Sequence, residues 1–418
     1  MAKGQKNLSR RGFLKRSAAV AGAIIGAPYF VPSSALGDDT RPAPSDRIIM
    51  GAIGVGNQGS GDTRTFAGFP QVQMVAICDV KKPAAEGLKN HCDKLYNNKD
   101  CKIYSDFREM LARTDIEAIN MAVPDHWHGL MSITAMKMGK DVFCEKPLSL
   151  TIRDGREMVT AARRYGRVVS SGSQRVWGDY GRLAQIVRSG AIGDIKEAYV
   201  STGAPSGPCF LPTEPIPEGF DYEMWLGPAP VGPYNSGRVS GSYGGVGWRI
   251  FEDYSGGQTT DWGAHKWGGV LFALQLDKTG PKEILPPGAA SKGVTMLFEN
   301  GMKLVHSGGR DMAYVGTSGE VSGGNEAKFK DVKYYIPNYH GNQGFYGDFV
   351  HCVRSRERCF QDFEVAHRTA SVCHLINICY KLNRPLKFDP VKEEFIGDPE
   401  ASRMLERPKR APWRIQGA

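Results

Sequence analysis

The sequence lacks the features of several specialised protein classes. Its nine cysteines include no Cys-x-x-Cys pair, which argues against a zinc ribbon. It has no internal repeat or low-complexity block, and 41% of its 418 residues are hydrophobic, which excludes a disordered linker or a collagen-like chain. No acidic residue precedes Asp38, so six positive charges of the net +9 belong to the first 37 residues. The remaining +3 predicts no basic face and no nucleic-acid partner.

The sequence also lacks a hydrophobic run long enough for a transmembrane helix. The small-residue apolar stretch 18–31 contains Pro28 and is shorter than the roughly 20 residues that a span requires. The preceding segment, Ser-Arg-Arg-Gly-Phe-Leu-Lys at 9–15, resembles a twin-arginine export signal. We expect residues 1–37 to engage the twin-arginine machinery and to send a folded protein, soluble or at most tethered, to the periplasm. The alternative is the basic N-terminus of a cytosolic enzyme.

The nine cysteines are expected to be mostly free and buried. Their number is odd, and Cys78 and Cys144 lie in strand-like runs that indicate core positions. Cys92 and Cys101 are the only nearby pair in loop-like sequence, and we expect no disulfide between them.

Residues 47–172 alternate between strand-like and helix-like segments. Continuous apolar runs, typical of parallel strands covered on both faces, occupy 47–53, 72–77, 118–123 and 141–144, with a further strand at 168–170. Helical patterns lie between them at 84–96, 106–112, 129–138 and 151–165. This alternation predicts an α/β fold whose N-terminal domain is a Rossmann domain with a doubly wound parallel sheet.

The pattern changes in residues 173–390. Gly, Pro and aromatic residues crowd 203–258, which indicates long ordered loops, and strand-like runs follow at 195–202, 294–298 and 303–307. Asn300-Gly301 between the last two favours a hairpin. We predict a C-terminal α+β domain with a large, mainly antiparallel open sheet, followed by a tail at 391–418. Its late helices, 344–354 and 364–383, either stay in this domain or pack back on the Rossmann domain.

A glycine pattern directly follows the first predicted strand. Residues 54–59 read G-x-G-x-x-G, in which the glycines permit a tight turn, close approach of a pyrophosphate and close helix–strand packing. The residues expected to bind a dinucleotide are Gly54, Gly56, Asn57, Gln58 and Gly59.

Asp79 stands 20 residues after Gly59, at the end of the second strand. A carboxylate there would accept hydrogen bonds from the adenosine ribose and favour NAD over NADP. Lys81 and Lys82 could reduce that preference, so NADP remains an alternative cofactor. The alternative is that Asp79 merely ends a strand.

Two further motifs follow predicted strands at the edge where parallel sheets bind ligands. In Glu145-Lys146-Pro147, Lys146 could donate to a substrate hydroxyl or carbonyl oxygen, or it could be a surface lysine in a turn. In the motif 124–128, Pro124, Trp127 and His128 could wall the nicotinamide pocket.

Asp261 and His265 are four residues apart and would share one face of a helix. His265 could then take a hydroxyl proton while Asp261 orients its ring. The alternative is a capping Asp followed by a structural His. A metal site is not expected, since no His-x-x-x-His or Glu-x-x-His partner stands nearby.

These four motifs occur in the order typical of the Gfo/Idh/MocA oxidoreductases, which the sequence resembles over about residues 47–390. The resemblance implies tightly bound NAD, a sugar or cyclitol substrate, and homo-oligomerisation through the C-terminal sheet. It implies Lys146 and His265 as the catalytic pair, with assistance from Asp261 and a cofactor contact from Glu145.

The segments 248–257, 397–401 and 410–413 look similar to an exported bacterial branch of that family. Gly268 stands where relatives often carry Asp, so recognition of substrate hydroxyls is expected to differ. The residues expected to contact substrate are Arg175, Trp177, Arg249, Tyr254 and Lys266.

Three functions compete at this point. The leading one is an NAD(P)-dependent oxidoreductase acting on a sugar, sugar derivative or cyclitol. The second is a redox-neutral glycoside-cleaving or epimerising enzyme that oxidises its substrate transiently. The third, a non-catalytic nucleotide-binding protein, is disfavoured because Lys146, Asp261 and His265 are all present.

Overall fold

The computed structural model describes residues 42–243, 246–306, 310–333, 340 and 344–414. The export signal expected in residues 1–37 lies outside this part of the chain. Residues 42–47 carry only the short 3₁₀ helix η1 (Pro44–Asp46) and belong to a separate unit. From Ile48 onward the chain forms one compact unit that contains two β-sheets.

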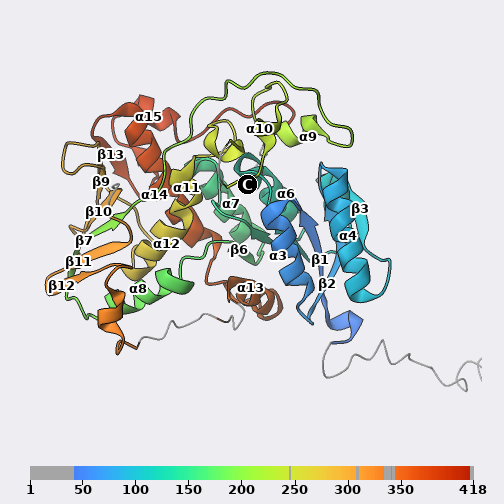
Figure 1. Ribbon diagram of the computed structural model, residues 1–418, viewed down its shortest axis with the longest axis horizontal. Coiled ribbons are helices and arrows are strands. Elements are labelled where there is room, and N and C mark those ends of the chain that lie inside the picture. Colours follow the sequence, from blue (N-terminus) through green and yellow to red (C-terminus); the bar gives the residue numbers. More distant parts are fainter. Residues whose placement is uncertain (1–41, 244–245, 307–309, 334–339, 341–343, 415–418) are drawn as a thin grey trace, which may run out of the picture. The chain divides into compact units, whose positions relative to one another are not determined.

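The first sheet has six parallel strands in the order β3-β2-β1-β4-β5-β6 (Figure 1). This is the doubly wound Rossmann order. Successive strands are added on one side of β1 up to β3 and on its other side from β4 onward, so the strand order reverses between β1 and β4. All residues of β4 and β5 are buried, as expected for strands covered on both faces. The strands are β1 (Ile48–Ile53), β2 (Val72–Cys78), β3 (Lys102–Tyr104), β4 (Ala118–Met121), β5 (Asp141–Cys144) and β6 (Val169–Ser171).

The connections between these strands are helical. The helices are α3 (Asn57–Ala67), α4 (Lys82–Tyr96), α5 (Phe107–Leu111), α6 (Asp125–Lys137) and α7 (Ile152–Arg164). The sequence predicted the Rossmann domain correctly, but it placed the start of α6 at 129, four residues too late. The structure begins α6 at Asp125, so the whole 124–128 motif forms the entry to a helix.

The second sheet has eight strands in the order β12-β11-β7-β10-β9-β8-β13-β14. Only β7 and β10 pair in parallel, and the other described pairs are antiparallel, which confirms a mainly antiparallel sheet. The strands are β7 (Ile195–Val200), β8 (Glu283–Leu285), β9 (Val294–Leu297), β10 (Lys303–His306), β11 (Ala313–Gly316), β12 (Gly319–Val321), β13 (Leu386–Asp389) and β14 (Glu394–Phe395).

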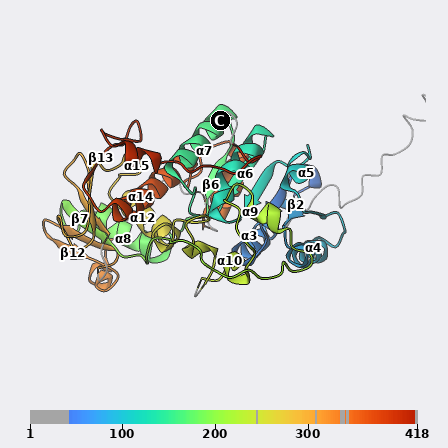
Figure 2. The same ribbon diagram turned by 90° about the horizontal axis from the view of Figure 1, so that it is seen from above.

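Three helices lie between this sheet and the Rossmann sheet: α8 (Gly178–Arg188), α12 (Gly263–Ala273) and α14 (Phe363–Leu382) (Figures 1 and 2). Their buried side chains form one core with the second sheet. The first turns of α14 contribute Phe363 and Ala366 to the core beneath α6 and α7. The helix α13 (Gly344–Ser355) contributes Phe349 and Cys352 to the core of β1 and β2. The late helices therefore pack back on the Rossmann domain.

The described residues of the 203–258 region are mostly loops, as the sequence predicted. They hold an aromatic cluster of their own, in which Tyr222, Trp225, Trp248 and Tyr254 are buried. The remaining short elements are α9 (Tyr222–Leu226), α10 (Ser236–Val239), η2 (Trp248–Ile250), α11 (Gln258–Asp261), η3 (Glu326–Phe329) and α15 (Pro399–Arg403).

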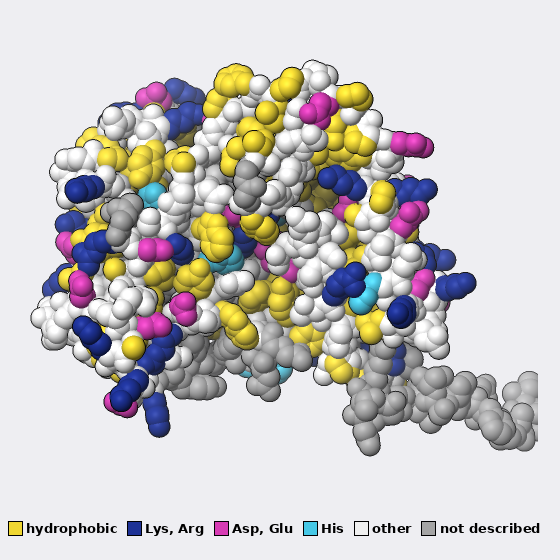
Figure 3. Space-filling model, in the orientation of Figure 1, with side chains coloured by type: hydrophobic (Ala, Val, Ile, Leu, Met, Phe, Trp, Pro, Cys, Tyr) yellow, Lys and Arg dark blue, Asp and Glu magenta, His cyan; other side chains and the backbone are white. Residues whose placement is uncertain are grey.

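The surface agrees with the composition. On the face shown in Figure 3, basic and acidic side chains are interspersed. All nine cysteines are free and eight of them are buried, as expected. Among the described residues, no helix combines the length and the apolar character that crossing a membrane requires.

Arg156 connects α7 to two distant parts of the chain. Its guanidinium binds Glu364 of α14 (Nη1–Oε2 2.6 Å) and Glu393, which precedes β14 (Nη2–Oε1 2.8 Å). Burial opposes ionisation of both carboxyls, but hydrogen bonds from Arg156, together with His367 at Glu393, lower the pKa of each to about 2.

We predict that Arg156→Ala lowers the free energy of unfolding by about 2 kcal/mol at pH 7, since it removes the cation that bridges two partly buried carboxylates and leaves them only Arg368 and, at Glu393, His367. Because the folded-state pKa values lie below the unfolded ones, this contribution exists above pH about 4.5 and is lost as the pH falls toward 2. Urea unfolding of the variant and the wild type across this range measures it. Arg153→Ala on the same helix is the control, and an equal loss at every pH would contradict the assignment.

Candidate active site

A pocket of about 190 Å³ lies at the carboxyl ends of β1, β2 and β4. The glycine loop lines it through Gly54, Gly56, Asn57 and Gln58, and Asp79 lines it from the end of β2. The 203–258 region supplies the opposite wall, with residues that the sequence did not single out. They are Met224, Trp225, Val239, Gly241 and Trp248, beside the expected Arg249.

The glycine loop fits a dinucleotide. Gly54 has φ +75°, and a Cβ there would lie 2.7 Å from Val123 Cγ1. A Cβ on Gly59 would lie 1.9 Å from the carbonyl oxygen of Gly54, so this glycine lets α3 approach the loop. Nothing lies within 4 Å of a Cβ built on Gly56, which precedes α3 without any side-chain cap. The first N–H groups of α3 are thus available to an anion such as a pyrophosphate.

Asp79 is held in place by the loop that it faces. Its Oδ2 accepts a hydrogen bond from the Val55 N–H at 2.7 Å and its Oδ1 one from the Lys81 N–H at 2.8 Å. Burial raises the pKa of Asp79, and these two hydrogen bonds oppose that shift. Lys81 lies over the Phe220 ring and Lys82 pairs with Glu86, so neither ammonium contacts Asp79 through an ion pair in the described structure.

Lys146 follows β5 and forms a buried ion pair with Asp261, with 2.5 Å between Nζ and Oδ1. Burial alone would lower the pKa of Lys146, but the charges of Asp261 and Glu145 outweigh it and raise the pKa. Arg249 approaches the same carboxylate at 3.6 Å. Lys146 is therefore a protonated, fixed donor and not a surface lysine.

The geometry of His265 corrects two expectations. Asp261 ends α11 and His265 lies in the first turn of α12, and the ring Nδ1 accepts a hydrogen bond from the Gln174 N–H at 2.9 Å. The ring is thus oriented by Gln174 and not by Asp261. Burial and the charge of Lys146 lower the pKa of His265 well below its usual value. A neutral ring whose Nδ1 accepts must carry its proton on Nε2, so His265 is a hydrogen-bond donor here and not the base that the sequence suggested.

The residues of the 124–128 motif have different roles: two of them line the pocket, and His128 holds neighbouring backbone segments in place. Pro124 and Trp127 line the pocket. His128, expected to wall the nicotinamide site, is instead buried between the Pro147 and Val123 carbonyl oxygens, both at 2.8 Å. It joins the end of β4 to the turn that carries Lys146, and is therefore a positioning residue.

Glu145 also differs from its expected cofactor contact. It is not among the described residues that line the pocket, and its carboxyl lies against Gly172, where a Cβ would be 1.9 Å from Oε1. Burial, with the neighbouring Asp62, raises its pKa well above the usual range. Glu145 is thus a buried carboxyl outside the pocket, and its Oε2 accepts a hydrogen bond from the Lys146 N–H.

Three of the five expected substrate contacts have structural partners instead. Arg175 is buried, binds Asp277 at 2.9 Å and lies between the Phe272 and Phe360 rings. Tyr254 is fully buried, and its hydroxyl accepts a hydrogen bond from Arg238. Lys266 donates to Ser201 and Asp311. A sequence pattern cannot distinguish side chains with such intramolecular partners from ligand contacts.

Arg249 and Trp177 remain candidates, and the structure adds three aromatic neighbours. Tyr243 lies over Arg249 at 4.1 Å and over Lys146 at 5.6 Å. Trp262 packs edge-on against His265, and Tyr180 stacks on the same ring. Trp262 lies within the 261–265 motif, but the motif implies no role for it, and no motif marks Tyr243 or Tyr180, which are placed by a loop and by the unpredicted helix α8.

Asp125, the first residue of α6, is a further buried carboxyl at this site. Burial and the negative charge of Asp261 raise its pKa to about 7, while the charges of Arg249 and Lys146 oppose the shift. The sequence offered no signal for it beyond its place in the 124–128 motif.

Comparison with known families agrees with this geometry. Residues 48–173 match the family model described as "Oxidoreductase family, NAD-binding Rossmann fold", and residues 202–415 match "Oxidoreductase family, C-terminal alpha/beta domain". The chain belongs to the Gfo/Idh/MocA oxidoreductase family. Its cofactor is accordingly NAD, and the pocket described above is where the chain's own residues would hold it.

The curated relatives include a "Glycosyl hydrolase family 109 protein 1" of Shewanella sp., 29% identical, and an "Alpha-N-acetylgalactosaminidase" of Shewanella oneidensis, 28% identical. In both cases the match covers 46% of this chain and 46% of the relative, so the chain spans about half the length of these relatives.

Among solved structures, myo-inositol 2-dehydrogenase from Lactobacillus plantarum is similar, with 18% identity, TM-score 0.56, and coverage of 82% of this chain and 100% of that one. The scyllo-inositol dehydrogenase of Lactobacillus casei, solved with NAD(H) and scyllo-inositol, gives 15% identity, TM-score 0.55, and 82% and 99% coverage. At these identities the likeness shows the shared fold.

We predict that Asp79→Ala weakens NAD binding and narrows the preference for NAD over NADP, since it removes the carboxylate that faces the ribose position. Titration with both nucleotides measures this. Glu86→Ala, which removes an exposed carboxylate on α4, is the control. An unchanged preference would remove Asp79 from the ribose site.

We predict that Lys146→Ala and His265→Ala each lower turnover by about 10²–10⁴-fold, with NAD binding retained. Since His265 acts as a donor, His265→Gln should keep more activity than His265→Ala. His91→Ala, on the distant α4, is the control. Equal activity of the Gln and Ala variants would restore the role of His265 as a base.

Proposed function

We propose that the protein oxidises a hydroxyl of a sugar, sugar derivative or cyclitol by hydride transfer to NAD. The observation that carries this proposal is the buried Lys146–Asp261 pair, which lies next to His265 at the carboxyl edge of the Rossmann sheet. Two donors, Lys146 Nζ and His265 Nε2, suit one substrate oxygen that gains negative charge.

The proton steps follow from the protonation of these groups. Because Lys146 is already protonated, it takes the hydroxyl proton only as it passes one of its own to Asp261 Oδ1, 2.5 Å away. His265 donates its Nε2–H to the same oxygen. Bound NAD, held by the glycine loop and Asp79, would supply the hydride acceptor. The carbinol thus loses a hydride and a proton, and the proton stays on Asp261.

The exposed aromatic side chains around this centre support a carbohydrate or cyclitol substrate. Trp262 is 44% exposed beside His265, and Tyr243 is 45% exposed over Lys146. Trp177 is 50% exposed at the start of α8. Its N–H donates to the carbonyl oxygen of Gln174, the residue whose own N–H binds His265. Such rings offer flat apolar faces to the C–H faces of a sugar ring, while the charged centre contacts its hydroxyls.

The glycosidase relatives favour a second candidate, redox-neutral cleavage of a glycoside. Here oxidation of a carbinol would acidify the C–H beside the new carbonyl, the leaving group would depart by elimination, and water addition and reduction would return NAD. The same Lys146 and His265 would serve the oxidation and the final reduction.

One experiment distinguishes the two candidates. The protein is incubated with a panel of free sugars and cyclitols and, separately, with aryl glycosides that include an α-N-acetylgalactosaminide. Net formation of reduced nicotinamide supports the oxidoreductase. Release of the aryl alcohol without net reduction, with solvent deuterium appearing beside the oxidised carbon, supports the glycosidase. Failure of every substrate in both assays would contradict a catalytic function.

We further propose that the protein is exported by the twin-arginine route to the periplasm, and that it assembles with copies of itself through its second sheet. An exported enzyme has no evident supply of free NAD, so it should bind NAD before export and retain it. The pocket has walls on two sides, the glycine loop and the 203–258 region, and this arrangement supports slow dissociation.

We predict that the mature protein, purified and gel-filtered without added nucleotide, releases about one nucleotide per chain on denaturation. The nucleotide is assayed in the supernatant. Activity that depends on added free NAD, with little nucleotide released, would contradict retention. Light scattering of the same sample reports the oligomeric state.

A further inference from the structure

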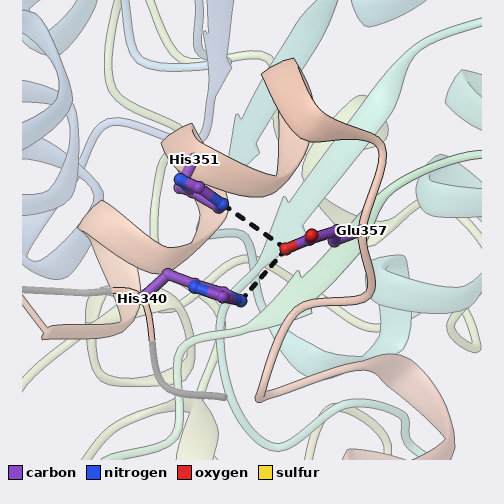
Figure 4. A group of neighbouring side chains, drawn as sticks. All are labelled: His340, His351 and Glu357. Carbon is purple, nitrogen blue, oxygen red and sulfur yellow. Dashed lines mark ion pairs between the residues drawn. The ribbon is translucent and has the colours of Figure 1, made fainter.

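Three polar side chains meet at the C-terminal end of α13, apart from the residues of the active site. They are His340, His351 and Glu357, and their potential ligand atoms all lie within 4.8 Å of one another (Figure 4). Both imidazoles direct Nε2 toward the same oxygen of Glu357, at 3.1 Å from His340 and 3.4 Å from His351. Neither the cofactor pocket nor the Lys146 centre uses any of the three.

The two nitrogen–oxygen separations are close to the spacing of ligand atoms around a small divalent ion, and the two imidazole rings, stacked with 4.3 Å between their centroids, would turn apart to share one ion. Two atoms that bind one zinc at about 2.0–2.1 Å with tetrahedral angles are about 3.4 Å apart. Two imidazole nitrogens and one carboxylate oxygen form a common zinc ligand set, and the exposed position leaves room for water in the remaining places.

Asp348, which is fully buried on α13, fixes the backbone on either side of this group. Its Oδ1 accepts a hydrogen bond from the His340 N–H at 3.2 Å, and its Oδ2 accepts one from the Phe360 N–H at 2.7 Å. Asp348 thus holds the His340 backbone on one side and the segment after Glu357 on the other. His351 lies three residues along α13 from Asp348 and therefore on the same side of the helix.

Arg356 directs Glu357 back toward the helix. It follows the last residue of α13 with φ +62°, a left-handed conformation that is uncommon for a residue with a side chain. Its guanidinium is fixed to Asp141 (Nη2–Oδ1 3.0 Å), at the start of β5. This turn places the Glu357 carboxylate beside His351, six residues earlier in the chain.

A second group, Asp348, Cys352 and Cys359, lies nearby but is a poorer site. It is buried, both oxygens of Asp348 are occupied by backbone N–H groups, and burial raises the pKa of Cys359 well above that of a free thiol. A thiol kept protonated is a weak metal ligand.

We propose that His340, His351 and Glu357 bind one zinc-class divalent cation, which links residue 340 to the end of α13. The ion is structural, since the site lies outside the catalytic machinery. Without a metal, the same three residues form only histidine–carboxylate ion pairs, and the test must separate these two states.

The test uses the tag-free full-length protein, treated with a chelator and titrated with zinc at pH 7.5 by calorimetry. We expect one zinc per chain, with affinity that falls as the pH is lowered because the imidazoles must be deprotonated to bind. His340→Ala, His351→Ala and Glu357→Gln should each weaken binding by at least about tenfold. His91→Ala, which removes another partly exposed histidine, should not.

Cobalt(II) identifies the ligands independently of any loss of folding. Bound to this site, it should show weak visible bands without a thiolate charge-transfer band, and His351→Ala should remove those bands while circular dichroism stays unchanged. Three outcomes would overturn the proposal: no zinc binding, equal affinity in all variants, or a thiolate band that Cys359→Ser abolishes.

Discussion

The buried ion pair between Lys146 and Asp261 is the interaction on which the rest of the site depends. Each charge, taken alone, would be costly at this depth, since an unpaired buried ion loses its hydration. Together they fix the turn after β5 against the end of α11, two segments 115 residues apart in the chain. The carboxyl edge of the Rossmann sheet and the first turn of α12 meet because this pair holds them.

The surrounding groups balance the charges of that pair. Arg249 adds a second cation at 3.6 Å from Asp261, and burial raises the pKa of Asp125 to about 7 and that of Glu145 well above its usual range. Two cations, Lys146 and Arg249, therefore face the Asp261 carboxylate. Cations at this place suit an oxygen that becomes negative as its carbon loses a hydride, and the charge of Lys146 adds to burial in lowering the pKa of His265.

The sequence predicted the parts of this site that depend on local pattern. Gly54, Gly56 and Asp79 follow buried strands at fixed spacing, and Lys146 follows β5 in the same way, so topology alone brings them to one edge. The partners of Asp261 and His265 could not be predicted. Gln174 contributes only a backbone N–H, which any residue type except proline would provide. Arg175 and Tyr254 are polar side chains satisfied inside the core, and nothing in a single sequence distinguishes them from ligand contacts.

The pocket, too, depends on contacts between segments that are far apart in the sequence. One wall is the glycine loop, which the sequence specifies, and the other is the 203–258 region, whose loops have little regular structure of their own. The C-terminal tail braces this region, since Arg410 donates to the Gly227 carbonyl at 2.9 Å and Trp413 packs on Trp127, with ring centroids 4.9 Å apart. Gly227 in turn leaves the space that Trp127 fills, because a Cβ there would lie 2.0 Å from the indole. Opening the pocket toward the 203–258 side would disturb the tail contacts and the indole packing together, and this coupling supports the retention of NAD that we propose.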